Sequence, residues 1–273
     1  MPLFQISLAE WSLHRSLYAR KINHLDFGRI EKEEYGIDAI ELVNRFFMNK
    51  ARDKSHLSEF KKRADDLGVR ILLIMCDDEG ALGHAVERER KKAVENHYKW
   101  LEAATFFGCH SIRVNARSTG RRDEQRERLA DGLRRLSEVA ATLNLNVLVE
   151  NHGGVSSDAG WLVSVIKKVA LPNCGTLPDF GNFRISLLKE YDRYKGVAEM
   201  MPFAKGVSAK AQTFDKNGNE TKTDYQRMMK IILDAGYRGY VGIEYSGLRM
   251  SEEKGIRATK RLLEKIRDVM GEH

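Results

Sequence analysis

The sequence contains little cysteine, with 3 Cys among 273 residues. Cys76, Cys109 and Cys174 are far apart, odd in number and in no metal-binding spacing. They therefore argue against a disulfide framework and favour a reducing compartment. We interpret them as buried structural thiols, because free cysteine is among the most buried residue types.

Long hydrophobic runs are also missing. No uninterrupted apolar stretch approaches the roughly 20 residues that a membrane-spanning helix needs. The first eight residues, MPLFQISL, lack the basic start and long apolar middle of a signal peptide. We therefore expect a cytoplasmic protein with no membrane partner, and we interpret residues 3–10 as its first strand.

Charge of one sign is only modestly in excess, at a formal net +7. Residues 87–92 and 121–128 interleave both signs, which usually indicates a solvated helix face. The small basic excess suits an anionic small substrate and does not by itself establish nucleic-acid binding.

Short apolar runs alternate with helical spacing along the chain. Several helical segments end at a glycine, such as Gly68 and Gly108, which is a helix-ending signal. We predict helices over 52–67, 85–107, 122–143, 157–169, 184–200, 223–235 and 251–270. We predict strands over 3–10, 36–43, 69–75, 110–115, 144–150, 175–179, 204–210 and 239–244.

Eight strands that alternate with helices imply a parallel sheet closed into a barrel. No Gly-x-Gly-x-x-Gly follows any strand, which weakens the alternative of an open doubly wound sheet. No linker, repeat or low-complexity tract indicates a second domain. The expected fold is a single (β/α)8 TIM barrel domain over residues 1–273.

Three of the predicted strands end in a carboxylate. NVLVENHGG at 146–154 carries Glu150, GTLPDFGNF at 175–183 carries Asp179, and GYVGIEYSG at 239–247 carries Glu244. The carboxyl ends of barrel strands build the active site. Three acids there would be costly unless a cation or a proton holds them together. As oxygen ligands they suit Mg²⁺ or Mn²⁺, although each could instead cap a loop or pair with Lys or Arg.

Other polar residues share these strand ends, and together they form an unusually polar ring. Alternation along a strand places Glu150 and His152 on one face, and likewise Ser208 and Lys210. The further members are Trp11, His14, Glu41, Asn44, Asp77, Arg113, Asn115, Asp179, Asn182, Gln212 and Glu244.

These motifs resemble the sugar phosphate isomerase/epimerase family, whose fold is the xylose isomerase-like barrel. The resemblance rests on VENHGG at 149–154, PDFGNF at 178–183 and GIEY at 242–245, with RVN at 113–115 on the fourth strand. It covers essentially the whole chain, and its motifs are specific for the family rather than for one substrate.

The resemblance implies a divalent metal held by Glu150, Asp179, Glu244 and a histidine on strand seven. This chain has Ser208 at the histidine position and keeps the lysine that follows as Lys210. The Asp-x-x-His pattern on strand six is also altered and ends at Asn182. His152 or Gln212 could replace the ligand. Without the imidazole the oxygen-rich site favours Mg²⁺ or Mn²⁺ over Zn²⁺, and a metal-free site is the alternative.

The resemblance further implies removal of a proton next to a sugar carbonyl and its return to the same or a neighbouring carbon. Two carboxylates on opposite sides of a substrate suit this exchange, and we assign Glu150 and Glu244 to it. Lys210 could stabilise the enolate oxygen, or simply pair with Glu244 or Asp179. Around them we predict substrate-binding roles for His152, Asn182, Arg113, Asn115, His14 and Trp11.

The expected partner is a small sugar or sugar phosphate, and a homo-oligomer is left open. A phosphate would be bound by Arg113 and the loop at 116–122, which could equally be a solvated helix start. Two alternatives compete with the isomerase. A barrel that binds a sugar without turnover is consistent with the missing histidine. An abasic-site endonuclease uses a cluster of metals with many histidine ligands, whereas strands two, three, six and seven end here without histidine.

Overall fold

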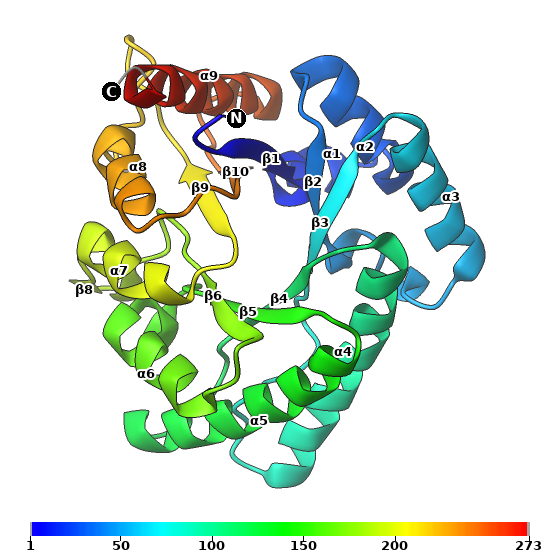
Figure 1. The fold of residues 1–273 in the computed structure, drawn as a ribbon, viewed down its shortest axis with the longest axis vertical. Helices are drawn as coiled ribbons and strands as arrows, with labels where there is room; N and C mark the ends of the chain where they lie inside the picture. The colour runs from blue at the N-terminus through cyan, green and yellow to red at the C-terminus, as the bar shows by residue number, and fades with distance from the viewer. Residues whose placement is uncertain (1, 272–273) are drawn as a thin grey trace.

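Eight parallel strands form one sheet that closes into a barrel, which confirms the expected fold class (Figure 1). The computed structural model describes residues 2–271. Met1 and the last two residues of the expected 1–273 domain lie outside this part. In chain order the barrel strands are β1 (Gln5–Ala9), β2 (Ala39–Val43), β3 (Arg70–Met75), β4 (Ser111–Asn115), β5 (Asn146–Glu150), β6 (Cys174–Leu177), β9 (Val207–Ala211) and β10 (Tyr240–Tyr245).

The strand order β6-β5-β4-β3-β2-β1-β10-β9 leaves one seam, between β6 and β9. Isolated parallel bridges close it at Thr176–Ala204 and at Asp179–Ser208. The Ser208 N–H donates to Pro178 O at 2.9 Å, and its carbonyl accepts from the Phe180 N–H at 3.0 Å. The β6–β9 seam therefore holds the barrel closed next to Asp179.

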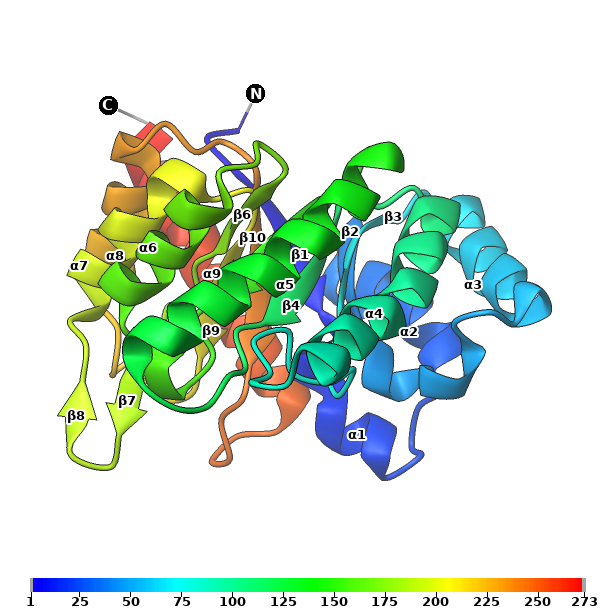
Figure 2. The same ribbon diagram turned by 90° about the horizontal axis from the view of Figure 1, so that it is seen from below.

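Helices surround the sheet on its outer face (Figures 1 and 2). Several begin at an aspartate whose side chain accepts a backbone N–H, as Asp53 does from His56 at 3.1 Å and Asp158 from Trp161 at 3.0 Å. The longer helices are α3 (Lys54–Asp66), α4 (Glu87–Phe107), α5 (Arg122–Thr142), α6 (Ala159–Val169), α7 (Arg193–Met200), α8 (Tyr225–Asp234) and α9 (Glu252–Gly271). No helix among residues 2–271 is long and apolar enough to cross a membrane.

Two segments differ from the sequence prediction. The helix predicted over 184–200 begins only at Arg193, because residues 184–190 form a hairpin of β7 (Arg184–Ser186) and β8 (Lys189–Glu190). Leu187 and Leu188 at its tip are fully or almost fully exposed, so no helical burial pattern exists there. The segment after β1, expected as a loop, instead contains the short helices α1 (His14–Tyr18) and α2 (Phe27–Ile30).

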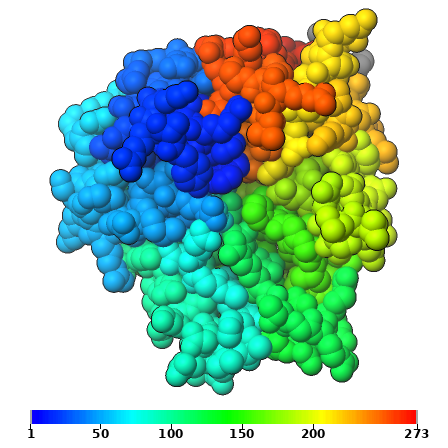
Figure 3. Space-filling view, turned by 180° about the vertical axis from the view of Figure 1, so that it is seen from behind, coloured from blue at the N-terminus to red at the C-terminus, as the bar shows by residue number. Residues whose placement is uncertain are grey.

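Inside the barrel, apolar side chains from β1, β2, β3, β5 and β6 pack together in one layer. Trp11 and Phe46 pack against this layer from the end at which the strands run out. Figure 3 shows the loops at this end, contributed by both halves of the chain and meeting around the middle of the face. The layer itself comprises Ala9, Val43, Leu73, Met75, Leu148 and Leu177.

Candidate active site

Three carboxylates meet where the strands end. Glu150 is the last residue of β5, Asp179 lies two residues beyond β6, and Glu244 is on β10. All three are buried, and one oxygen from each lies within 4.8 Å of the others. We call these residues the carboxylate cluster. Their placement brings together the three acids that the sequence pattern predicted.

Asp179 is held rigidly by its neighbours. Its Oδ1 accepts the backbone N–H groups of Gly181 and Asn182, each at 2.8 Å, and its Oδ2 accepts Ser208 Oγ at 2.8 Å. The Asn151 side chain holds the backbone from the other side, accepting the Asp179 N–H at 2.7 Å and donating to the Asp179 carbonyl at 3.0 Å. Ser208, at the position of the implied histidine ligand, thus orients Asp179.

Glu150 contacts an amide and a guanidinium. Asn182 Nδ2 donates to Glu150 Oε1 at 3.0 Å, and Arg113 Nε lies 2.9 Å from Glu150 Oε2. The latter pair is not aligned as a hydrogen bond, so Oε2 accepts none from the described residues. Arg113 Nη1 also donates to Asp77 Oδ1 at 2.8 Å, and Asn115 Nδ2 donates to the same oxygen at 2.7 Å.

Glu244 pairs with Lys210, its register partner on β9. The Lys210 Nζ lies 2.5 Å from Glu244 Oε1, and the lysine side chain is only 10% exposed. Both side chains project from neighbouring parallel strands to the same end of the barrel. The ammonium is therefore already at the edge of the carboxylate cluster.

Burial raises the pKa of two acids in the carboxylate cluster, whereas the charge of Lys210 lowers the pKa of the third. Burial raises the pKa of Glu150 and of Asp179 to about 7. Burial would also raise the pKa of Glu244, but the charge and hydrogen bond of Lys210 outweigh it and lower that pKa. Burial opposes the charge of Lys210, and the surrounding carboxylates nevertheless raise its pKa above the usual value.

The charges around the cluster do not balance when every group is ionised. The three carboxylates and Asp77 face two cations, Lys210 and Arg113. Burial would raise the pKa of Asp77, but the Arg113 charge holds it below its ordinary value, so that this acid remains ionised. The site is short of two positive charges, which two protons or one divalent cation would supply.

The other predicted residues are divided between the cluster and its rim. The His152 side chain is exposed at the rim. Trp11 and His14 stack with ring centroids 4.8 Å apart, and His14 Nδ1 lies 2.7 Å from the Trp11 carbonyl oxygen. The suggested replacement ligand Gln212 instead accepts Lys222 Nζ at 2.5 Å. The substrate-binding roles predicted for the rim residues remain predictions.

Three residues at this site were given no role from the sequence. Asp77, although visible at a strand end, anchors Arg113, and Asn151 fixes the backbone around Asp179. Glu41 on β2 lies inside the barrel, where Ser7 Oγ donates to its Oε1 at 2.7 Å. A carboxylate in the middle of an apolar strand run was the available signal for Glu41.

Comparisons with known proteins agree with this architecture. The family model described as "Xylose isomerase-like TIM barrel" matches residues 31–266. No curated protein sequence matches the chain. Among solved structures, a D-tagatose 3-epimerase-like protein is similar at 15% identity and a TM-score of 0.74, covering 98% of this chain and 99% of that chain.

Two further structures illustrate the range of similar proteins. The IolI protein, described with a binding zinc atom, has 11% identity and a TM-score of 0.74 over 97% of this chain and 98% of that chain. The 3-keto-D-glucoside 4-epimerase YcjR from E. coli has 17% identity and a TM-score of 0.66 over 97% of this chain and 100% of that chain. At these identities the likeness concerns the fold.

Proposed function

Because the chain belongs to the xylose isomerase-like TIM barrel family, we propose that it is a sugar or sugar-phosphate isomerase or epimerase. The observation that carries the proposal is the carboxylate cluster, three buried acids from β5, β6 and β10 at one end of the barrel. Similar structures named as a D-tagatose 3-epimerase-like protein and a 3-keto-D-glucoside 4-epimerase support a carbohydrate substrate.

In the proposed reaction, Glu150 and Glu244 exchange a proton with the carbon next to the sugar carbonyl. One carboxylate removes the proton, and the other returns a proton to the same or a neighbouring carbon. Lys210, whose ammonium is held at the cluster by Glu244, stabilises the negative oxygen that develops when the proton leaves. Arg113 keeps Glu150 in place through its second contact with Asp77.

The residues present fit a hard divalent cation. The cluster offers oxygen donors only, Glu150 Oε2 accepts no hydrogen bond from the described residues, and two positive charges are lacking. Glu150, Asp179 and Glu244 would hold the ion, with Mg²⁺ or Mn²⁺ favoured over Zn²⁺. When bound, such an ion would polarise the substrate carbonyl as a Lewis acid.

The test is solvent-deuterium exchange followed by NMR in D₂O, with D-tagatose, D-fructose and their 6-phosphates offered as substrates. We expect deuterium to enter next to the carbonyl of at least one of these ketoses. Glu150→Gln and Glu244→Gln should each reduce the exchange rate by about 100-fold or more, in the range of a lost general acid or base. Glu253→Gln, at an exposed position, is the matched control and should leave the exchange rate unchanged. Undiminished exchange in both Glu150→Gln and Glu244→Gln would exclude the roles assigned to these two residues.

A second candidate is a barrel that binds sugars without turning them over. The contact between Lys210 and Glu244 favours it, because an ammonium already occupies part of the cluster. Sugar binding with no exchange in the wild-type protein would support this candidate. An abasic-site endonuclease is less consistent with the site, because the one candidate metal group among the described residues consists of carboxylates without histidine. We expect no nicking of abasic DNA by the pure protein.

A further inference from the structure

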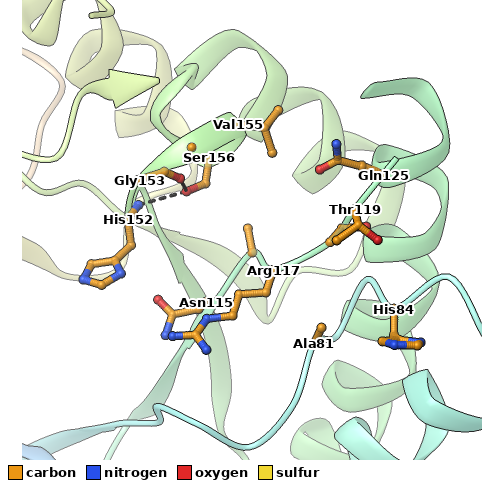
Figure 4. A pocket seen from close by; sticks show the side chains of 13 residues that line it. Ala81, His84, Asn115, Arg117, Thr119, Gln125, His152, Gly153, Val155 and Ser156 are labelled. Atoms are coloured by element: carbon orange, nitrogen blue, oxygen red, sulfur yellow. Dashed lines mark hydrogen bonds between the residues drawn. The ribbon is translucent and has the colours of Figure 1, made fainter. Parts of the chain in front are cut away.

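A cavity of about 590 Å³ lies beside the carboxylate cluster, between the loops that follow β3, β4 and β5 (Figure 4). We call it the side cavity. Asn115 and Arg117 lie along one side of it, across from Val155 and Ser156, while Thr119 and Gln125 close a third side. Nothing in the proposed proton exchange requires this space.

The side cavity and the cluster share a wall. Asn115, which lines the cavity, is the register partner of Glu150. Its Nδ2 is bound to Asp77, whereas its Oδ1 has no hydrogen-bond partner among the described residues. A buried acceptor without a donor is costly, so Asn115 Oδ1 at this wall is suited to a ligand hydroxyl. A ligand over the cluster can therefore extend into the cavity past Asn115.

The charge of the lining disfavours a phosphate. Arg117 is the one Lys or Arg side chain in the lining, and its Nη1 already lies 3.5 Å from Asp78 Oδ1. The backbone N–H groups of His152 and Gly153 are also occupied, because they donate to Ser156 Oγ at 3.0 Å and Ser157 Oγ at 3.1 Å. A phosphate needs charge-assisted donors, and beyond Arg117 the lining offers only the imidazoles of His84 and His152.

The same lining suits a second sugar unit. It alternates hydroxyl and amide groups, as at Ser118, Thr119 and Gln125, with small apolar surfaces at Ala81 and Val155. A pyranose ring presents the matching combination of hydroxyl edges and C–H faces. The volume lies within the range of about 300–1,000 Å³ found for small-molecule sites. None of the three cluster acids lines it, so it can hold a unit beyond the reacting ring.

We propose that the substrate is a glycoside or disaccharide whose uncharged second unit occupies the side cavity while its reacting ring lies over the carboxylate cluster. This inference rests on the proposed function for the reacting ring, and adds the substrate class. The loops after β3, β4 and β5, which carry none of the reacting side chains, then determine how many sugar units the substrate has.

The experiment compares dissociation constants, measured by calorimetry, for cellobiose, maltose and lactose, for glucose and galactose, and for glucose 6-phosphate. We expect at least one disaccharide to bind at least about 10-fold more tightly than either of its units. Val155→Trp, which fills the cavity, should reduce this preference below about 2-fold without changing monosaccharide affinity, whereas Val155→Thr should retain it. Thr119→Trp, at an exposed position on another wall, is the second filling variant should Val155→Trp fail to fold.

Three results would overturn the inference. The first is that no disaccharide binds more tightly than its units. The second is that a disaccharide preference survives in both filling variants. The third is that glucose 6-phosphate binds more tightly than every disaccharide and loses this advantage in Arg117→Ala. Deuterium exchange distinguishes a failure of the side-cavity inference from a failure of the proposed function. Exchange on free ketoses without a disaccharide preference would refute the side-cavity inference alone, and a disaccharide preference without exchange on any sugar would refute the proposed function alone.

Discussion

Lys210 decides how the carboxylate cluster can be occupied. Its ammonium contacts Glu244, and the charges of all three cluster acids raise its pKa, so that it stays protonated at any physiological pH. A divalent cation placed among the same oxygens would be repelled by this charge. Lys210 and a metal ion therefore compete for Glu244, and the strength of the metal site depends on one side chain.

We predict that Lys210→Met tightens Mn²⁺ binding by about 10-fold or more, equivalent to about 1.4 kcal/mol. The substitution keeps an unbranched side chain, one heavy atom shorter, and removes the competing charge. Titration of Mn²⁺ followed by electron paramagnetic resonance measures the dissociation constant directly. Lys222→Met, which removes a lysine from the exposed loop after β9, is the matched control and should change the constant little. Weaker binding in Lys210→Met would show that the ammonium supports the metal site.

Glu41 is a second residue whose ionisation is governed by its surroundings. It is buried inside the barrel and hydrogen-bonded to Ser7, and burial raises its pKa to about 7. In the unfolded chain the same carboxyl titrates near 4.5. Between these two pH values the folded protein holds a proton that the unfolded chain has lost, so its stability falls as the pH rises through this window.

We predict that Glu41→Gln gains stability relative to the wild type as the pH rises from 5 to 8, by about 3 kcal/mol over the whole window. The reason is that glutamine cannot ionise and so avoids the cost of a buried charge. Urea unfolding at several pH values measures the difference. Exposed Glu138→Gln is the control and should show no such trend. A difference that stays constant with pH would contradict the assignment.

The sequence located the charged residues well because a carboxylate at the end of an apolar run is conspicuous. Glu150, Asp179 and Glu244 were predicted to converge, and the cluster brings them together. The positioning contacts were not predictable, since they depend on distances between strands. Nothing in the pattern indicated that Ser208 orients Asp179 or that Asp77 anchors Arg113.

At the scale of elements, the strands were predicted more accurately than the connections. Buried parallel strands produce continuous apolar runs, and all eight appear in the barrel. The β7–β8 hairpin was wrongly predicted as the start of a helix, because its residues are mostly exposed and carry no burial pattern. The helices between β1 and β2 are too short to show a helical period in the sequence.

The packing of α5 against the loop that carries Leu82 offers a test at this scale. Gly132 lies within α5, and a Cβ added there would be 2.0 Å from the Leu82 carbonyl oxygen. We predict that Gly132→Ala destabilises the protein by about 1–3 kcal/mol, as overpacking does. Gly28→Ala in α2 is the matched control. Its added Cβ would meet nothing closer than 3.8 Å, so stability should stay the same or rise slightly.

Thermal or urea unfolding measures both glycine variants. Equal stabilities for Gly132→Ala and Gly28→Ala would mean that α5 and the Leu82 loop can separate without cost. Because Ala81 in that loop lines the side cavity, the same result would mean that this wall is not held in a fixed position.

At the scale of the whole molecule, a ligand that binds only the folded barrel must stabilise it. We predict that Mn²⁺ at about 100 times its dissociation constant adds about 2.7 kcal/mol. For a chain of this size the melting temperature should rise by about 5–10 °C. The paired substitution Glu150→Gln with Asp179→Asn should remove the rise. An unchanged melting temperature in the wild type at millimolar Mn²⁺ would favour the metal-free form of the site.

The β6–β9 seam has a consequence for how the barrel opens. It is joined by two isolated bridges, whereas the other neighbouring strands are paired in ladders, of which the β1–β2 ladder is the shortest with two register pairs. Local unfolding is favoured where backbone pairing is sparse, so we expect the amide protons of Phe180 and Ser208 to exchange when the barrel opens locally at this seam. Asp179 stands on one side of this junction, and Glu244 lies beyond the strand on the other side. A ligand that contacted both acids at once would therefore span the β6–β9 seam, so that ligand binding and the opening of the barrel at this seam would be coupled.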